Sequence, residues 1–243
     1  MPLPILMYHA IAAVDEDPNA LCVPPDRFAQ QLATLRRAGL KGVGVGELLA
    51  ARRRGHGRNL VGLTFDDGYA DFLTAACPIL EEHGCSGTVF VLSGRPGGTN
   101  AWDPVPELDL LTVEQIREVS ARGMEVGSHG RLHQRLTDLD PSELEREVAG
   151  SRDELRDLLG YTPAGFCYPY GAVDARVLNA AAGAGYTYAC AVKIATPGTF
   201  ALRRFFVGAA DHPLRLVAKL GLDSLGLYGR EGPRLPAMPS GVG

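Results

Sequence analysis

The sequence predicts an α/β fold in which about seven parallel strands form a barrel. Short apolar segments alternate with helical patterns over about 220 residues, which is typical of a parallel sheet. Polar side chains suited to chemistry follow several of the apolar segments, at the trailing ends of separate strands. They are His9, Asp66 and Asp67, Ser128 and His129, and the stretch from Tyr168 to Tyr170. A barrel gathers such ends at one mouth, whereas an open sheet gathers only those beside its switch point.

The expected strands are short apolar or β-branched segments bounded by turn-forming residues. The clearest is Leu60 to Phe65, which carries no charge and ends at two aspartates and a glycine. A segment of this kind is typical of a strand buried on both faces. In chain order, the expected strands cover 4–8, 43–45, 60–65, 86–92, 124–127, 164–168, 186–192 and 202–207.

The expected helices combine apolar residues at helical spacing with start and stop signals. Thr112 and Gln115 form a capping box, and Asp140 followed by Pro141 is a second helix start. Pro78 is expected to kink the helix that contains it or to mark a boundary within it. The helices are expected at 25–39, 47–54, 70–83, 112–122, 140–159, 175–183 and 212–220.

Two segments fall outside this alternation. Residues 93–111 are rich in turn formers and contain the only tryptophan, Trp102, and a loop of this length is usually functional or mobile. Beyond Gly229 the chain is rich in proline and glycine with little to bury. We therefore expect one barrel domain over residues 1–228 and a flexible or surface-draped tail over 229–243.

Composition narrows the function classes. The chain has 243 residues with 24 Lys and Arg against 28 Asp and Glu, and a formal charge of −4 does not favour a nucleic-acid partner. No apolar stretch is long enough to span a membrane, and the first residues do not resemble a signal peptide. The five cysteines form no Cys-x-x-Cys pair and suit a reducing compartment. These features predict a cytoplasmic protein, and they leave its oligomeric state open.

The two acidic residues after the third strand and two downstream histidines suggest a metal site. Asp66 and Asp67 repel each other unless a metal, a cation or water compensates. His129 and His133, four residues apart, can offer two nitrogen ligands to one divalent metal. One carboxylate would complete three ligands and leave an open position, and the other would be free to accept a proton. A solvated turn and two helix-capping histidines are the structural alternative, and it weakens when both features occur together.

Three motifs follow one another along the chain, at Thr64 to Tyr69, at Ser128 to His133 and at Phe166 to Gly171. In this order they resemble the first motif, the second motif (His-Ser/Thr-x-x-His) and the third motif of the polysaccharide deacetylases (the chitooligosaccharide deacetylase or NodB homology domain, carbohydrate esterase family 4). The resemblance covers roughly residues 4 to 207. It implies a distorted (β/α) barrel and metal-dependent removal of an acetyl group, usually from an N-acetylated sugar.

The resemblance also implies roles for individual residues. Asp67, His129 and His133 would bind the metal, commonly zinc in this family, with cobalt, nickel or manganese as alternatives. Asp66 would be the general base, and the backbone N–H of Tyr170 would stabilise the oxyanion. The partner would then be an acetylated carbohydrate or a related small molecule.

The chain departs from the family pattern at three places. Gly130 replaces the usual Ser or Thr of the second motif, and Cys167 stands where an Arg commonly pairs with the base. Arg203 or Arg204 is a candidate for the missing cation. The last motif, whose histidine protonates the leaving amine, has no clear match. The candidates for that general acid are His9, which we prefer because it ends a strand at the expected mouth, and His212.

Substrate contacts are expected from aromatic residues near the mouth. Trp102 either stacks on a sugar ring or pins its loop to the barrel, and Tyr69, Tyr168 and Pro169 are further candidates, with Tyr69 and Tyr170 half-buried. Two alternatives to the sugar deacetylase stay open. One is a catalytically silent barrel that binds glycan, and the other is the same hydrolysis on a non-polymer amide or ester metabolite.

Overall fold

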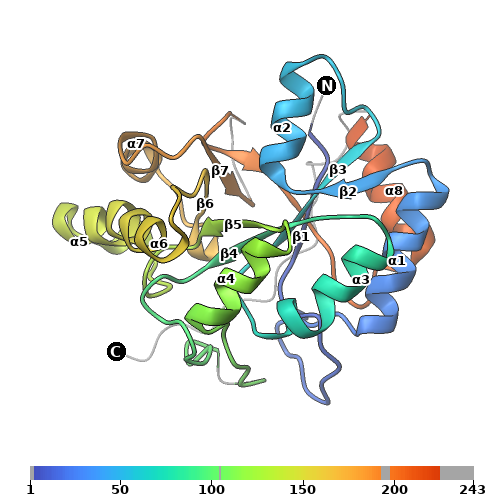
Figure 1. Cartoon of the computed structure of the whole chain (residues 1–243), viewed down its shortest axis with the longest axis horizontal. Coiled ribbons are helices and arrows are strands. Elements are labelled where there is room, and N and C mark those ends of the chain that lie inside the picture. Colours follow the sequence, from blue (N-terminus) through green and yellow to red (C-terminus); the bar gives the residue numbers. More distant parts are fainter. Residues whose placement is uncertain (1–2, 104, 193–197, 225–243) are drawn as a thin grey trace.

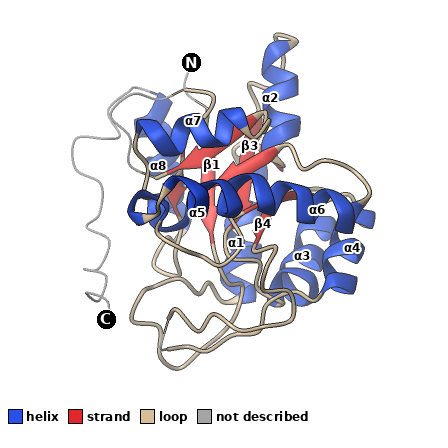
Figure 2. Ribbon diagram, turned by 90° about the vertical axis from the view of Figure 1, so that its left-hand side faces the viewer, coloured by secondary structure: helices blue, strands red, loops and turns tan. Residues whose placement is uncertain are grey.

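A parallel sheet forms the centre of the molecule, with helices around it (Figures 1 and 2). The computed structural model describes residues 3–103, 105–192 and 198–224, with side chains described up to residue 220. Within these ranges the strands are β1 (Ile5–Tyr8), β2 (Lys41–Val43), β3 (Leu60–Phe65), β4 (Thr88–Val91), β5 (Glu125–Ser128), β6 (Gly165–Cys167), β7 (Tyr188–Ala191), β8 (Leu202–Arg203) and β9 (Phe205–Phe206). Every pairing between them is parallel.

One interrupted strand nearly closes the sheet into a barrel. The strand order is β8-β7-β6-β5-β4-β3-β1-β9, with β2 beside β3, so β8 and β9 are the two ends of the order. Only Arg204 separates these ends in the sequence. The strand pairs with β7 before Arg204 and with β1 after it. The predicted α/β barrel is therefore confirmed, and the expected strand 202–207 is split because it changes partner.

Helices cover the outside of the barrel (Figure 1). They are α1 (Pro25–Arg37), α2 (Val45–Arg53), α3 (Cys77–Glu82), α4 (Val113–Ala121), α5 (Pro141–Glu145), α6 (Ser151–Leu159), α7 (Ala175–Gly183) and α8 (Pro213–Ser224). Wider π turns at Phe72–Ala76 and Arg146–Gly150 lead into α3 and join α5 to α6. No helix in the described ranges is both long enough and apolar enough to cross a membrane.

Most expected elements are present, and the differences have local causes. The capping box at Thr112 and the N-cap at Asp140 are both formed. Pro78 is the second residue of α3, directly after the boundary with the π turn at Phe72–Ala76, so the expected kink or boundary at this proline is found as a boundary. The expected strand 43–45 is wrong in its bounds, because α2 already begins at Val45. The predicted tail, 229–243, lies outside the described residues.

Alternation along the strands places the site residues inside the barrel. Side chains two apart in a strand share a face. Met7 and His9 at the end of β1, and Asp66 just after β3, therefore face the same interior as Arg204 between β8 and β9. Gly127 and Gly165 leave room lower in the barrel, where an added Cβ would collide with the rings of Phe90 and Tyr188.

Candidate active site

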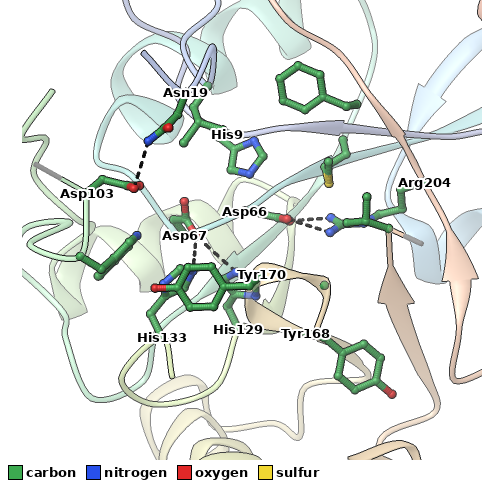
Figure 3. Close-up of a pocket in the computed structure, with 16 residues that line it drawn as sticks. His9, Asn19, Asp66, Asp67, Asp103, His129, His133, Tyr168, Tyr170 and Arg204 are labelled. Carbon is green, nitrogen blue, oxygen red and sulfur yellow. Dashed lines mark hydrogen bonds and ion pairs between the residues drawn. The ribbon is translucent and has the colours of Figure 1, made fainter. Parts of the chain in front are cut away.

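The polar residues that follow the strands line one cavity at the carboxyl end of the barrel (Figure 3). The cavity has a volume of about 130 Å³. Its walls include the predicted residues His9, Asp66, Asp67, Trp102, His129, His133, Tyr168 and Tyr170. The sequence-based expectation that separate strand ends meet at one mouth is therefore confirmed.

Three buried side chains form a cluster that fits a metal ion. The Asp67 Oδ1 atom lies 3.2 Å from His129 Nε2 and 3.2 Å from His133 Nε2. The three side chains can each offer one ligand atom, and these atoms lie within 4.8 Å of one another. One carboxylate and two imidazoles are a usual donor set for a catalytic divalent metal such as zinc. The described residues thus fit the metal that the motifs imply.

The backbone holds two of these ligands in an uncommon conformation. Asp67 has a φ of 70° and His133 a φ of 61°, in the left-handed region that non-glycine residues rarely adopt. Such conformations persist where the surrounding structure fixes them, and they occur often at functional sites.

Each histidine ring is oriented in a different way. His129 Nδ1 donates a hydrogen bond to the Cys167 carbonyl oxygen at 2.9 Å, which fixes the ring with Nε2 toward Asp67 Oδ1. The buried Nδ1 of His133 has no hydrogen-bond partner among the described residues. Its ring lies instead between Trp102, stacked at 4.3 Å, and Tyr170, at 4.5 Å between ring centroids.

Trp102 therefore supports a candidate metal ligand. Beyond its contact with His133, its ring also has the Arg95 guanidinium 5.7 Å from its centroid. These contacts fit the expectation that Trp102 pins its loop to the barrel. The ring also lines the cavity, so stacking on a sugar stays a prediction.

Asp66 is paired with Arg204, which decides between the two arginine candidates. Arg204 Nη1 donates to Asp66 Oδ1 at 2.6 Å and Nη2 donates to Oδ2 at 2.7 Å. Both side chains are buried, with 4% of Asp66 and 3% of Arg204 exposed. The arginine thus reaches the base candidate from the break between β8 and β9.

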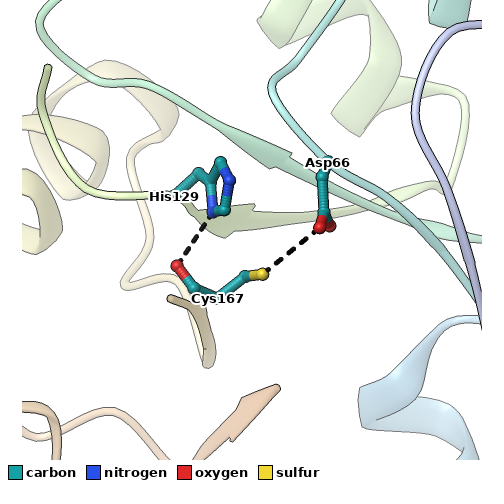
Figure 4. Close-up of side chains that lie close together, drawn as sticks. All are labelled: Asp66, His129 and Cys167. Carbon is teal, nitrogen blue, oxygen red and sulfur yellow. Dashed lines mark hydrogen bonds between the residues drawn. The ribbon is translucent and has the colours of Figure 1, made fainter. Parts of the chain in front are cut away.

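Cys167 occupies the space next to this pair. Its thiol donates to Asp66 Oδ2 at 3.6 Å and accepts from Arg204 Nη2 at 3.0 Å. Figure 4 shows that Cys167 also links Asp66 to His129 through its carbonyl oxygen. These three residues form a second potential ligand group. Both Asp66 oxygens already accept hydrogen bonds from Arg204, so Asp67, His129 and His133 are the better set.

The two adjacent aspartates differ in their electrostatic partners. Burial acts to raise the pKa of Asp66, but the charge and hydrogen bonds of Arg204 outweigh it and hold the pKa below its usual value. Burial also acts to raise the pKa of Asp67, and hydrogen bonds from His129 and His133 hold it well below its usual value. Both groups are carboxylates at neutral pH, but only Asp67 faces the imidazole nitrogens.

Of the two general-acid candidates, His9 lines the cavity and His212 does not. Burial lowers the pKa of His9, while the Asp67 and Asp66 carboxylates oppose that shift. Within the part of the chain that the structure describes, the buried His9 Nδ1 has no hydrogen-bond partner. His212 is exposed, and its carbonyl oxygen accepts the Leu216 N–H at the start of α8.

The remaining aromatic candidates lie in different environments. Tyr69 is only 2% exposed and does not line the cavity, so the expectation of a half-buried mouth residue is wrong. It packs instead beside Leu110 in an apolar cluster under the loop. Tyr168 lines the cavity, but its hydroxyl donates to the Phe200 carbonyl oxygen, and Pro169 is buried outside the lining. Tyr170 is half-buried, as expected.

Sequence reasoning missed part of the cavity wall. Asn19 Nδ2 donates to Asp103 Oδ1 at 3.1 Å, and this bond joins two loops across the cavity rim. Burial, together with the Asp67 charge, raises the pKa of Asp103 to about 6. Leu21, Val192 and Phe206 add apolar surface. Asn19, Leu21 and Asp103 lie in irregular loops, which carry no periodic pattern to reveal which side chains turn inward.

Known proteins resemble the chain in both sequence and structure. Residues 53–189 match the family described as polysaccharide deacetylase. YxkH of Bacillus subtilis, which bears the name of a polysaccharide deacetylase, is 30% identical over 186 residues, covering 76% of this chain and 62% of YxkH. Chitin deacetylase 1 of Cryptococcus neoformans is 30% identical over 130 residues, covering 54% of this chain and 25% of that protein. The chain thus spans about three fifths of the length of YxkH and a quarter of the length of the chitin deacetylase.

Solved structures show the same architecture over most of the chain. The Streptococcus pyogenes deacetylase PplD, solved in complex with acetate, has a TM-score of 0.78 at 28% identity and covers 90% of this chain and 97% of its own. IcaB from Ammonifex degensii has a TM-score of 0.75 at 25% identity, and the match covers 89% of this chain and 96% of IcaB.

Proposed function

The chain belongs to the polysaccharide deacetylase family, and on that basis we propose that it is a metal-dependent hydrolase of acetyl groups. The substrate that fits best is the N-acetyl group of a sugar or oligosaccharide. The observation that carries the proposal is the Asp67, His129 and His133 cluster beside an Asp66 already paired with Arg204. This arrangement separates a ligand set from a base within one cavity.

Asp67, His129 and His133 would hold the metal, with zinc as the first choice and cobalt, nickel or manganese as alternatives. When bound, such an ion lowers the pKa of a coordinated water and polarises a carbonyl oxygen. Asp67 is committed to this role because its Oδ1 atom faces both imidazoles.

Asp66 would take the proton from the attacking water as general base. Its low pKa keeps it ionised and ready to accept that proton. Arg204 would hold the carboxylate in one orientation through two parallel hydrogen bonds, and such bidentate pairs fix geometry well. Arg204 is thus a positioning residue that acts through Asp66.

His9 would return a proton to the leaving amine, because it lines the same cavity as Asp66. The backbone N–H of Tyr170 would donate to the developing oxyanion. Tyr170 has a φ of 58°, an uncommon backbone conformation for a non-glycine residue and one consistent with such a role.

Two alternatives are weaker. A silent glycan-binding barrel has no need for three buried ligand groups converging on one point. Hydrolysis of a non-polymer amide or ester would use the same groups, and it differs only in what the loops around Asn19 and Asp103 accept.

Acetate release from small N-acetylated oligosaccharides tests the proposal. The full chain is assayed as purified, after chelator treatment, and after zinc or cobalt is restored. We expect release that chelator removes and metal restores. Release that survives complete removal of the metal would contradict the mechanism, and metal binding without release would direct the search to another acyl substrate. Glycan binding with neither metal nor release would support the silent barrel.

A further inference from the structure

The loop that carries both candidate histidine ligands wraps around one buried carboxylate. Glu147 lies in the π turn between α5 and α6 and is only 2% exposed. Its Oε2 atom accepts hydrogen bonds from the backbone N–H of Arg131 at 2.8 Å and of Leu132 at 3.1 Å. These two residues are the last two before His133 in the loop from His129 to His133.

The backbone approaches this carboxylate closely. Gly130 has a φ of +83°, and a Cβ added there would lie 3.0 Å from Glu147 Oε2. Successive N–H groups around a left-handed residue form a concave anion-binding site, which the Glu147 carboxylate occupies from within the protein. The Gly130 N–H is engaged separately, because it donates to Ser128 Oγ at 3.1 Å. Glycine at this position therefore gives the loop the shape that admits Glu147.

A second glutamate on the same helical segment ties down the loop from its outer side. Glu154 Oε1 accepts from Arg131 Nε at 2.8 Å, and Glu154 Oε2 accepts from Ser93 Oγ at 2.6 Å. Of these two glutamates, Glu147 accepts hydrogen bonds from the backbone between the histidines, and Glu154 binds the Arg131 side chain. The carbonyl oxygens of Gly130 and Arg131 accept the N–H groups of Ser93 and Gly94. Burial of a carboxylate is costly unless strong hydrogen bonds compensate, and those of Glu147 come from that backbone.

We infer that Glu147 is a positioning residue that fixes the loop so that His129 and His133 face Asp67 before a metal arrives. It acts through the N–H groups of residues 131 and 132 and does not touch metal or substrate. The left-handed conformation of His133, directly after Leu132, is the conformation that these bonds would stabilise. This inference rests on the proposed function insofar as it assumes a metal at the cluster.

Metal affinity tests the inference without relying on turnover. Cobalt is titrated into the metal-free full chain, and its visible absorption reports both affinity and ligand geometry. We expect E147A to bind cobalt about 10- to 100-fold more weakly, the usual range for losing a group that orients a metal ligand. E147Q keeps an oxygen acceptor in place and should recover most of this loss. Glu145 is exposed two residues earlier on the same segment, so E145A is the control expected to bind normally.

A glycine pair provides the second test, should E147A fold poorly. Gly123 has a φ of +82°, close to that of Gly130, but nothing lies within 4 Å of its added Cβ. G130A and G123A therefore introduce similar backbone strain, and only G130A presses on Glu147. We expect only G130A to weaken cobalt binding, and to do so less when Glu147 is already alanine, as a double-mutant cycle would show.

The outcomes separate this inference from the proposed function. Unchanged cobalt affinity and spectrum in a folded E147A would overturn the role of Glu147 and leave the deacetylase proposal standing. Equal effects of G130A with and without Glu147 would also overturn it. A wild-type chain that binds no metal would contradict the proposed function itself.

Discussion

Asp66 and Asp67 show how neighbouring residues of one type can acquire different roles. The left-handed backbone at Asp67, with φ of 70°, turns its side chain away from that of Asp66. Asp67 then faces two imidazoles, while Asp66 faces a guanidinium. Because a cation already neutralises Asp66, that residue can stay ionised without occupying the metal site. The division of labour therefore follows from the partners rather than from the residue type.

Replacing Arg204 should impair Asp66 specifically. R204M removes the cation that lowers the pKa of Asp66, so that pKa should rise. Because the base must be ionised, the acidic limb of the pH–rate profile of acetate release should move to higher pH. Loss of a positioned base typically costs about 100-fold or more in kcat. An unchanged acidic limb in R204M would contradict the pairing.

A rescue variant separates this effect from simple misfolding. Cys167 lies beside the same carboxylate, at the position where the family commonly has an arginine. In the double variant C167R/R204M, a cation returns to Asp66 from the end of β6, in the space beside Asp66 that Arg204 occupied. We expect part of the lost turnover to return. The acidic limb of the pH–rate profile should also move back to lower pH. C167R alone should not help, because two guanidiniums would then compete for one space.

The two histidine candidates give a matched pair of predictions. H9A should lower acetate release by about 100-fold, within the range expected for a general acid, and leave bound metal unchanged. H212A should leave release within a factor of two, because His212 is exposed outside the cavity. Release rates and metal content of the two variants check this directly. The reverse pattern would transfer the role of general acid to His212.

At the scale of elements, the interrupted strand supplies a site residue and one π turn supplies a residue that holds the histidine loop. The break between β8 and β9 is the point at which Arg204 enters the barrel, and the π turn between α5 and α6 presents Glu147. A π turn adds one residue to a helical turn and re-aims the side chains around it, and such turns are frequent at functional sites. Irregularities in these elements thus coincide with the site.

The start of α2 explains why some boundaries could not be predicted. Gly44 at its N-cap has no side chain to accept a hydrogen bond. The first N–H groups of the helix donate instead to Thr88 Oγ1 and to Glu125 Oε2. These acceptors come from strands β4 and β5, so no local start signal exists near residue 45. Helices with their own caps, such as α4 and α5, began where the sequence indicated.

Asp71, at the start of the π turn Phe72–Ala76, makes the stability of the fold depend on pH. Its carboxylate accepts the Ile11 N–H at 2.8 Å, and burial raises its pKa to about 6. An acid with a raised pKa stabilises the fold below its unfolded pKa of about 3.9, and that stabilisation is lost as pH rises through 6. At about 1.4 kcal/mol per pH unit, the effect approaches 3 kcal/mol.

D71N should remove this dependence, because an amide oxygen still accepts the Ile11 N–H and never ionises. Relative to the wild type, the free energy of unfolding of D71N should rise between pH 4 and pH 7 by about 2 to 3 kcal/mol. Denaturant unfolding of the metal-free proteins at both pH values measures the difference. A difference in the free energy of unfolding that is the same at both pH values would show that ionisation of Asp71 does not destabilise the fold.

At the scale of the whole molecule, the sequence predicted the barrel and the position of its site. Alternating strands and helices indicated parallel pairing, and the polar residues after each strand indicated a shared mouth. It could not predict contacts between distant loops, such as Asn19 with Asp103, nor the choice of Arg204 over Arg203. The contact between the loops depends on tertiary packing. The choice of arginine depends on which of two adjacent residues on the closing strand faces the interior, and local sequence patterns do not encode either feature.

We also predict that residues 1–228 are sufficient to fold. The last described helix, α8, ends at Ser224, and Lys219 Nζ ties it to Asp211 at 2.6 Å and to the Phe206 carbonyl oxygen at 2.8 Å. A chain that ends after residue 228 should therefore melt within about 2 °C of the full chain and release acetate at the same rate. A substantially lower melting temperature would show that residues 229–243 belong to the folding unit.

The most direct test of the account measures metal content and acetate release together in D66N and D67A. Asp67 is a ligand in this account and Asp66 is not, so the two neighbouring variants should differ in kind. We predict that D66N binds metal like the wild type but releases almost no acetate, while D67A loses both. A fully active D66N, or a D67A that keeps its metal and its turnover, would contradict the division of labour on which the proposed mechanism depends.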